Sequence, residues 1–576
     1  MKRQELIMDS FRLTSMIERT GDHKMRRMRR RERGCRGGVD KGCRGGVEER
    51  LIDMISQASE GDGDDGEMIL LHNTPIELVP FVVMEYSPLS SIFLLITPLF
   101  LFFIFKQRFR SSKNLPPGPL SWPIVGNIHQ IGPNPHVSIS SFAREYGPLI
   151  SLHLGTQLLV VASSPGAALE ILKTQDRHLS GRAIPNAFEH SFSPFYLVWS
   201  ADCGEHWKSL RTLCRTELFS PKALEAQSNL RDEKLAQMID FLLGKKQEVV
   251  NIGEVVFTTM FNTISNVFFG KDFIDFEDEH GTAGGLKGKL FTLLKDGIRP
   301  NISDFFPLVR RLDLQGIRRG NLKNIRELFS FWEDIVDERR TQINSSIVVA
   351  DEEKNFLDRL IENGFSNDQI NICAMELFIA GVDTTTSTIE WAIAELLKNE
   401  EALSKVKEEL KYKSNTKIVG ELQLSNISYL NACIKETLRL HPSVPFLIPR
   451  RASEACEVMN YTIPQNTQIF VNVWAIGRDP KVWEDPLSFT PQRFIDSNLD
   501  FKGQDFEFIP FGAGRRMCPG LPAGIKSVQS ILASLIKRFD WVLPNDEDPA
   551  KLDMNEKFGV TLQKEKPLQL IFKALD

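Results

Sequence analysis

The stretch PFGAGRRMCPG, residues 510–520, carries the strongest chemical signal in the chain. Its glycines allow tight turns and a close backbone approach to a bulky planar group, and Arg515 and Arg516 place permanent cations beside Cys518. A cysteine flanked by cations and loop amides has a stabilised thiolate, the form that binds metal. A single sulfur ligand with no neighbouring Cys or His fits haem iron better than zinc or an iron–sulfur cluster. A structural free cysteine is the alternative.

A long helix with an unusual centre is predicted from Ser366 to about residue 397. Ser366 and Gln369 form a capping box, and an apolar run follows them. The centre, AGVDTTT at residues 380–386, contains a glycine, an acid and three threonines, which all weaken a helix. We expect the threonines to bond back to main-chain carbonyls, and Asp383 to need a partner or water. A bent core helix with a satisfied Asp383 is the alternative to a reactive site.

A second helix, SYLNACIKETLRLHP at residues 428–442, places Glu436 and Arg439 three residues apart on one face. Such pairs are common surface features worth well under 1 kcal/mol, so this signal alone is weak. It is strengthened by HPSVPFLIPRR at residues 441–451, whose prolines predict an extended strand, and by Arg493 in FTPQRF.

A membrane anchor is predicted over residues 84–110. Residues 87–105 contain nineteen residues without a charge, enough to cross the core of a bilayer as a helix. Basic residues follow the run at once, so the positive-inside rule leaves the following domain in the cytosol. The proline-rich residues 111–127, which include NLPPGPLSWPIVGN, predict a stiff, extended hinge.

Residues 1–83 differ from the rest of the chain. They contain an arginine-rich run at 24–36, the hexamer GCRGGV twice, and as many acidic as basic residues. No helical or strand period runs through them, so we expect disorder, or an extension outside the functional chain that begins at Met84. A nuclear or nucleic-acid tag is the alternative, but the predicted topology places this segment in the lumen.

The composition is that of a large folded protein, with 42% hydrophobic and 25% charged residues among 576. A net charge of -5 gives no whole-chain attraction to nucleic acid. Eight cysteines without a CxxC pair argue against a disulfide scaffold and against structural zinc. Short strands such as LISLHLG and LLVVASS precede long helical stretches, so residues 128–576 are predicted to form one mainly α domain with small β-sheets (α+β).

These motifs together resemble the cytochrome P450 family of haem-thiolate monooxygenases, in its plant microsomal form. The likeness spans residues 84–576 in the family's order, and the FxxGxRxCxG signature is met between Phe511 and Gly520. Gln492 departs from the family's usual glutamate, which puts only a local loop contact in question. The resemblance implies Cys518 as the ligand of haem b iron, Trp207, Arg211, Arg450, Phe511 and Arg516 as haem contacts, Asp383 and Thr384 as catalytic proton carriers, Glu436, Arg439 and Arg493 as a structural triad, and Phe378, Ala380, Val444, Phe446 and Leu447 as pocket residues.

The resemblance further implies a protein of the endoplasmic reticulum membrane, with a single-pass anchor and a cytosolic catalytic domain. Its electrons would come from NADPH through NADPH–cytochrome P450 reductase, because no motif for flavin or nicotinamide is present. A haem-binding sensor without turnover is the alternative from another class, but a sensor has no need of Asp383 and Thr384.

Within the family, four segments resemble the plant subgroup of N-methylcoclaurine 3'-hydroxylase and its phenol-coupling relatives: LCRTELFSPK, ELFIAGVDTTTSTIEW, NYTIPQN and KFGVTLQKE. This implies a benzylisoquinoline alkaloid as substrate, oxidised by aromatic hydroxylation or by phenol coupling. A terpenoid-hydroxylating member is the alternative. An alkaloid amine would need an acid or a π-face, for which Asp383 and, in a variable loop, Glu189 beside His190 are the acids available.

Overall fold

The computed structural model describes residues 97–98, 114–189, 193–277, 282–345, 354–413 and 427–575. The chain divides into two units, Met1–Ser91 and Ile92–Asp576, and all the described residues belong to the second. The predicted extension at 1–83 and, except for Thr97 and Pro98, the predicted membrane run at 87–105 lie outside the described residues. Among the helices that are described, none has the length and apolar character needed to span a bilayer.

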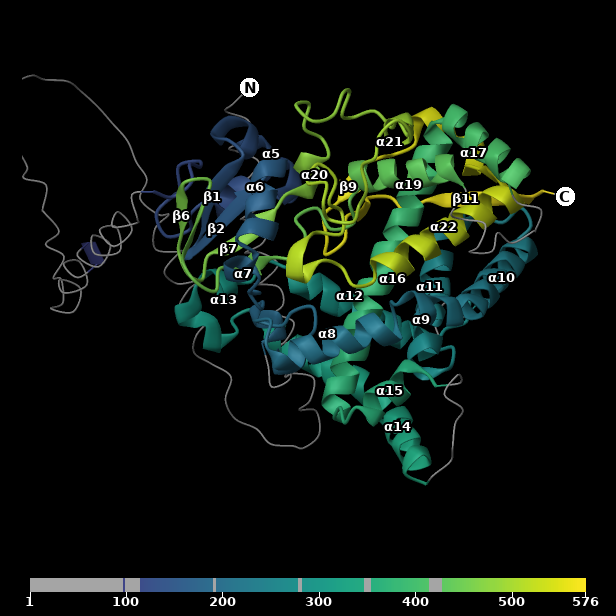
Figure 1. The fold of residues 1–576 in the computed structure, drawn as a ribbon, viewed down its shortest axis with the longest axis horizontal. Coiled ribbons are helices and arrows are strands. Elements are labelled where there is room, and N and C mark those ends of the chain that lie inside the picture. The colour runs from purple at the N-terminus through teal and green to yellow at the C-terminus, as the bar shows by residue number, and fades with distance from the viewer. Residues whose placement is uncertain are drawn as a thin grey trace, which may run out of the picture. The chain divides into compact units, whose positions relative to one another are not determined.

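Helices dominate the described unit, as predicted (Figure 1). The longer ones are α5 Pro135–Tyr146, α8 Glu205–Glu217, α10 Ser228–Gly244, α11 Ile252–Phe269, α12 Thr282–Ile298, α14 Ile317–Asn344, α16 Asn367–Lys398, α17 Glu400–Lys413, α19 Ser428–Leu440 and α22 Leu521–Arg538. The shorter α-helices are α4 Ile128–Ile131, α6 Pro165–Leu169, α7 Asp176–Leu179, α9 Pro221–Ala226, α13 Ile302–Phe305, α15 Phe356–Glu362, α20 Val473–Ile476 and α21 Gln492–Ile495.

The described strands form small sheets. They are β1 Leu149–Leu154, β2 Gln157–Ala162, β3 Val250–Asn251, β4 Arg450–Arg451, β5 Cys456–Val458, β6 Tyr461–Ile463, β7 Gln468–Val471, β8 Phe539–Val542, β9 Glu556–Lys557, β10 Gln563–Lys564 and β11 Gln569–Ala574. A four-stranded sheet has the order β1-β2-β7-β4, with β2 and β7 parallel and the other pairs antiparallel. A three-stranded sheet β3-β11-β8 and the pairs β9-β10 and β5-β6 complete the set. The predicted strands LISLHLG and LLVVASS are thus the β1-β2 hairpin.

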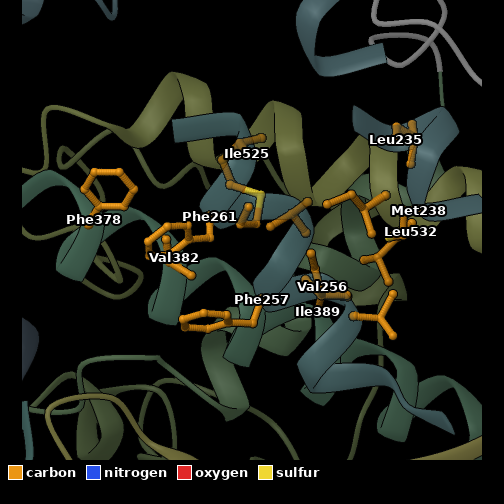
Figure 2. Close-up of a cluster of buried hydrophobic side chains, with 14 of the residues drawn as sticks. Leu235, Met238, Val256, Phe257, Phe261, Phe378, Val382, Ile389, Ile525 and Leu532 are labelled. Carbon is orange, nitrogen blue, oxygen red and sulfur yellow. The ribbon is translucent and has the colours of Figure 1, made fainter. Parts of the chain in front are cut away.

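The main core lies where α10, α11, α16 and α22 pack together (Figure 2). Burying one side chain the size of leucine or phenylalanine stabilises a fold by roughly 1.5–3 kcal/mol, so this contact holds α16 firmly in place. The labelled members are Leu235 and Met238 from α10, Val256, Phe257 and Phe261 from α11, Phe378, Val382 and Ile389 from α16, and Ile525 and Leu532 from α22.

Helix α16 begins as its sequence predicts. Ser366 and Gln369 form the reciprocal capping box, and the helix continues without interruption through the threonine-rich centre. Thr384 donates to the Ala380 carbonyl at 2.7 Å, which is the back-bonding expected of threonine in a helix. The predicted length is confirmed.

The hinge has no helix or turn over residues 115–121, where it packs along β1, but it folds back in a tight turn at residues 122–126, where the main chains of Trp122 and Gly126 bond each other at 3.0 and 3.1 Å. The Pro117 carbonyl accepts from the Ser151 amide at 2.9 Å, and Gly118 lies so close that a Cβ there would meet the Ser151 carbonyl oxygen at 2.0 Å. The prolines therefore place the hinge against the sheet.

The prediction of a strand over residues 441–451 is wrong. Only β4, Arg450–Arg451, is extended and paired, whereas the Leu447 amide donates to the Val444 carbonyl at 3.0 Å in a turn. Leu447 has a left-handed φ of 53°. The prolines fix φ but remove the N–H groups that a strand ladder requires, so the segment turns instead.

Candidate functional site

The cysteine loop, residues 510–520, precedes α22 and leaves the Cys518 side chain exposed. The Cys518 amide donates to the Phe511 carbonyl at 3.0 Å, which closes the loop on itself. Gly514 has a φ of 71°, and a Cβ there would meet the Leu172 carbonyl oxygen at 2.2 Å, so only glycine fits. The loop therefore presents its sulfur in a fixed direction.

The electrostatics at Cys518 differ from the sequence expectation. Although solvent reaches the sulfur, the protein packed around it desolvates the thiolate and raises the pKa of the Cys518 thiol, while the amides of Gly520 and Leu521 and the charge of Arg211 act in the opposite direction. The flanking Arg515 bonds Asp176 instead, through its amide at 3.2 Å and its Nε at 3.4 Å. The expectation that the two adjacent arginines stabilise the thiolate is therefore wrong: they point to other partners.

Four arginines form a cluster on one side of the cysteine loop: Arg182, Arg211, Arg450 and Arg516. Burial lowers the pKa of Arg182 well below its usual value, and the charges of the other three lower it further. Arg450 bonds Asp176 at 2.7 Å and the Ala513 carbonyl at 3.0 Å. The cluster thus collects mutually repelling cations, of which Arg450 bonds the Asp176 carboxylate directly.

The other three arginines of the cluster donate to main-chain carbonyls. Arg211 donates to Met517 in the cysteine loop. Arg182 donates to Ile448, and to Pro449 at 3.1 Å. Arg516 donates to Ser180 at 3.0 Å and to Ser200 at 2.7 Å. Neutral carbonyls leave the positive charge uncompensated, which favours an anionic ligand here.

The Trp207 ring, on α8, contacts two of these arginines, Arg516 and Arg211. Its Nε1 donates to the Leu197 carbonyl at 3.0 Å, and the guanidinium of Arg516 stands 4.8 Å from its ring centroid, with that of Arg211 at 5.9 Å. The structure therefore brings Trp207, Arg211, Arg450 and Arg516 together, as the sequence analysis expected of haem contacts. Phe511 is half-buried in the cysteine loop, against Phe501.

One face of α16 is open near its centre although most of the helix is buried. Ala380 is exposed and Thr384, four residues later on the same face, is half-exposed. The neighbouring Asp383 is buried, and it accepts from Thr561 and, at 2.9 Å, from Gln563 near the C-terminus. Burial raises the pKa of Asp383 against these two hydrogen bonds. The acid is partnered, as the sequence analysis required.

Glu436, Arg439 and Arg493 meet in the interior. Arg439 makes a two-pronged bond to Glu436 at 2.7 and 2.8 Å, and the Nε of Arg493 donates to the same carboxylate at 3.0 Å. The side chains of Glu436 and Arg439 are both 0% exposed. This is a buried charge network, not the surface pair that the spacing alone suggests. Gln492 bonds Asp496 at 3.0 Å, a local contact outside the network.

The expected pocket residues do not all lie together. Phe378 is two residues, or about 200°, around the helix from Ala380, and it stacks on Trp332 at 5.6 Å in the core. Phe446 packs on Phe470 at 5.2 Å within the core of the β1-β2-β7-β4 sheet. Neither lies on the open face of α16. Phe378 instead lines a cavity with Phe257, Phe291 and Val382, so it stays a predicted pocket residue, whereas Phe446 belongs to the core of the sheet.

Val444 and Leu447 are half-exposed, and Leu447 reaches the cysteine loop at Gly512. Glu189, the second acid considered for a substrate amine, bonds Arg310 at 2.6 Å instead. Its main-chain carbonyl accepts from Arg318 at 2.7 Å. Glu189 is therefore already neutralised by a cation.

Two site residues were missed by the sequence analysis. Arg182 follows a glycine in LSGRAIP and shows no periodic signal, although the structure adds it to the arginine cluster. Glu376 lies four residues before Ala380 and is buried, and it accepts hydrogen bonds from main-chain amides of residues 197–199. An acid inside an apolar helix was the available signal, but only Asp383 was singled out.

The residues present fit haem b. An exposed cysteine sulfur supplies the thiolate, an open helix face at Ala380 leaves room, and the arginine cluster supplies cations for the carboxylate groups of the porphyrin. The hydrogen bonds from these arginines to main-chain carbonyls hold the cations in place without neutralising them.

The comparisons with known proteins agree with this fit. The family model described as Cytochrome P450 matches residues 116–572. The chain is 49% identical to a probable (S)-N-methylcoclaurine 3'-hydroxylase isozyme 2 of Coptis japonica, over 83% of this chain and 96% of that protein. It is 44% identical to corytuberine synthase of Coptis japonica, over 83% and 97%. It is 40% identical to geraniol 8-hydroxylase of Swertia mussotii, over 81% and 95%.

Proposed function

The chain belongs to the cytochrome P450 family of monooxygenases, and on that premise we propose that it oxidises a phenolic ring of a benzylisoquinoline alkaloid. The observation that supports this most strongly is the chain's 49% identity, over 83% of its length, to a relative named as a probable (S)-N-methylcoclaurine 3'-hydroxylase. Likeness to corytuberine synthase keeps phenol coupling beside hydroxylation as the form of the oxidation.

The roles of the chain's residues follow from their positions. Cys518 would ligate the haem iron, and the arginine cluster with Trp207 would hold the carboxylates. The bound haem supplies the activation of dioxygen. Thr384, on the open face, has a hydroxyl oxygen that can accept a hydrogen bond while its O–H donates to the Ala380 carbonyl. Asp383, whose pKa burial raises, can carry a proton once its bond to Thr561 opens.

From the same premise we infer the electron donor and the cellular location of this enzyme. Electrons come from NADPH through a membrane-bound reductase, and residues 84–110 anchor the chain in the endoplasmic reticulum membrane with the catalytic domain in the cytosol. The charge-free run at 87–105, followed by basic residues, supports the anchor.

A terpenoid is the second candidate substrate, because the chain is also similar to a geraniol hydroxylase. The two classes differ in charge: the alkaloid has an amine that is cationic at neutral pH, whereas a monoterpenol is neutral. A spectral titration separates them. We expect N-methylcoclaurine or reticuline to shift the haem from low spin to high spin by displacing bound water, and geraniol to give no shift. A shift and a product with geraniol alone would contradict the alkaloid proposal and leave the monooxygenase activity standing.

Replacing Thr384 by alanine is expected to uncouple electron consumption from product formation. The open face of α16 would lose the hydroxyl that orders water and passes protons, so NADPH oxidation should continue while hydrogen peroxide replaces product. The measurement is the ratio of product to NADPH consumed, with peroxide assayed in parallel.

The matched control is Thr386→Ala. Thr386 is buried two residues further along the same helix, and its hydroxyl has no hydrogen-bond partner among the described residues. This variant should keep the wild-type ratio. Equal coupling in the two variants would show that another group delivers the protons.

A further inference from the structure

The buried carboxylate of Glu376 accepts hydrogen bonds from main-chain amides of a segment that lies 177 to 179 residues earlier in the chain. The Leu197 amide donates to it at 2.6 Å, the Val198 amide at 3.0 Å and the Trp199 amide at 3.1 Å. Three successive amides that converge on one carboxylate form charge-assisted hydrogen bonds, which are stronger than bonds between neutral groups. We call residues 197–200 the strap.

The carbonyl groups of the strap bond the other way, to the arginine cluster. Arg182 Nε donates to the Val198 carbonyl at 3.3 Å. Arg516 donates to the Leu197 carbonyl at 3.4 Å and to the Ser200 carbonyl at 2.7 Å. The strap therefore joins α16, through Glu376, to two of the cations assigned to the haem carboxylates.

The strap also borders the open face of α16. Glu376 and Ala380 are four residues apart, so they lie one above the other on the same face, and Thr384 follows one turn later. A segment fastened at Glu376 is thus held one helical turn from the exposed Ala380. The strap thus lies beside the turn of α16 that precedes its open face.

We propose that Glu376 is a positioning residue: it fixes the strap against α16 and thereby sets the pocket wall beside Ala380 and the orientation of Arg516. Substrate affinity then depends on a side chain that does not touch the substrate. The part of this inference that concerns substrate rests on the proposed function, whereas the part that concerns the strap does not.

The charged and titratable groups around Glu376 indicate that its hydrogen bonds to the strap depend on pH. Burial raises the pKa of Glu376 to about 7, against the three strap amides and the charge of Arg516, which lower it. The other titratable neighbours are Tyr196 beside the strap and Cys373 on the same helix, and burial raises the pKa of Tyr196. The carboxylate is thus ionised above about pH 7, where it accepts all three amides, and it becomes protonated below that pH.

The first test is Glu376→Gln, with hydrogen–deuterium exchange of the strap as the readout. An amide side chain offers one acceptor oxygen and turns its own N–H donors toward the strap, so we expect the amides of residues 197–199 to exchange about tenfold faster or more. Glu376→Asp keeps the charge on a shorter stem, and we expect it to restore part of the protection. The aspartate variant also provides the exchange measurement if the glutamine variant fails to fold.

The matched control is Glu390→Gln. Glu390 is a buried acid on the same helix, but it accepts a single amide, that of Leu568, at 2.7 Å. We expect this variant to leave strap exchange at the wild-type rate. Unchanged strap exchange in Glu376→Gln, or equal acceleration in the control, would overturn the positioning role.

The second test is substrate affinity, followed by the spin-state shift. In the wild type we expect the alkaloid to bind more weakly as the pH falls through about 7, because the strap loses its ionised acceptor. In Glu376→Gln we expect the alkaloid to bind about tenfold more weakly at pH 8, with haem content retained. We also expect its affinity to show no change as the pH passes through about 7. Wild-type affinity with the same pH dependence in the variant would overturn the effect on substrate. If no alkaloid or terpenol shifts the wild-type spectrum, the proposed function fails, while the exchange experiment still decides the role of Glu376.

Discussion

Replacing Cys518 by alanine is expected to abolish monooxygenase turnover, below the detection limit of a product assay. The cysteine loop holds this sulfur exposed, with the amides of Gly520 and Leu521 and the charge of Arg211 favouring its thiolate. No other described cysteine lies in that loop, so the variant has no thiolate to offer the haem iron. The measurement is NADPH-dependent product formation with added reductase, together with the haem content of the purified protein.

The control for this prediction is Cys456→Ala. Cys456 is half-buried in β5, a strand of the small β5-β6 pair, and burial raises its thiol pKa to about 11. It should keep its haem and full turnover. Turnover by the Cys518 variant at even a few per cent of the wild-type rate would refute the ligand assignment.

Replacing Glu436 by alanine is expected to have the largest effect on stability. The change leaves Arg439, whose side chain is 0% exposed, as an uncompensated buried cation, and it also removes the acceptor for Arg493 and for the Thr490 amide. Removing one partner of a buried ion pair costs roughly 3–5 kcal/mol, a large part of the total stability of about 5–15 kcal/mol. Thermal unfolding and the yield of folded protein measure the loss.

Glu401→Ala is the matched control for that loss. Glu401 pairs with Lys405 at 2.7 Å, both on α17, but the Glu401 side chain is 83% exposed. Water screens an exposed pair almost completely, so the melting temperature should hardly change. Similar melting temperatures for the two variants would show that the buried network is not needed for the fold.

The contrast between these two acids shows where the sequence stops being informative. Glu436 and Arg439 have a spacing that occurs equally on helix surfaces and in cores, and only the tertiary structure separates the two cases. The capping box at Ser366 and the β1-β2 hairpin were predictable, because caps and periodicity act locally. The cysteine loop was predictable because its residue types are constrained by chemistry.

The errors have physical causes as well. Phe446 is an apolar residue near the site motifs, but a single sequence does not say which side of a turn points into the core of a sheet. Prolines at 442, 445 and 449 indicated an extended backbone correctly at β4 and wrongly before it, because a missing N–H also removes the ladder. Glu376 was overlooked although an acid inside an apolar helix was a signal; its partners are main-chain amides, which no side-chain pattern in the sequence reveals.

The central claim is that Cys518 gives this chain a thiolate-ligated haem. The most direct test is the reduced, carbon monoxide difference spectrum of membranes that express the full chain. We predict the band position of thiolate-ligated haem, and its loss in Cys518→Ala. A spectrum of the histidine-ligated type in the wild type, or a thiolate-type band that survives in the variant, would contradict the claim.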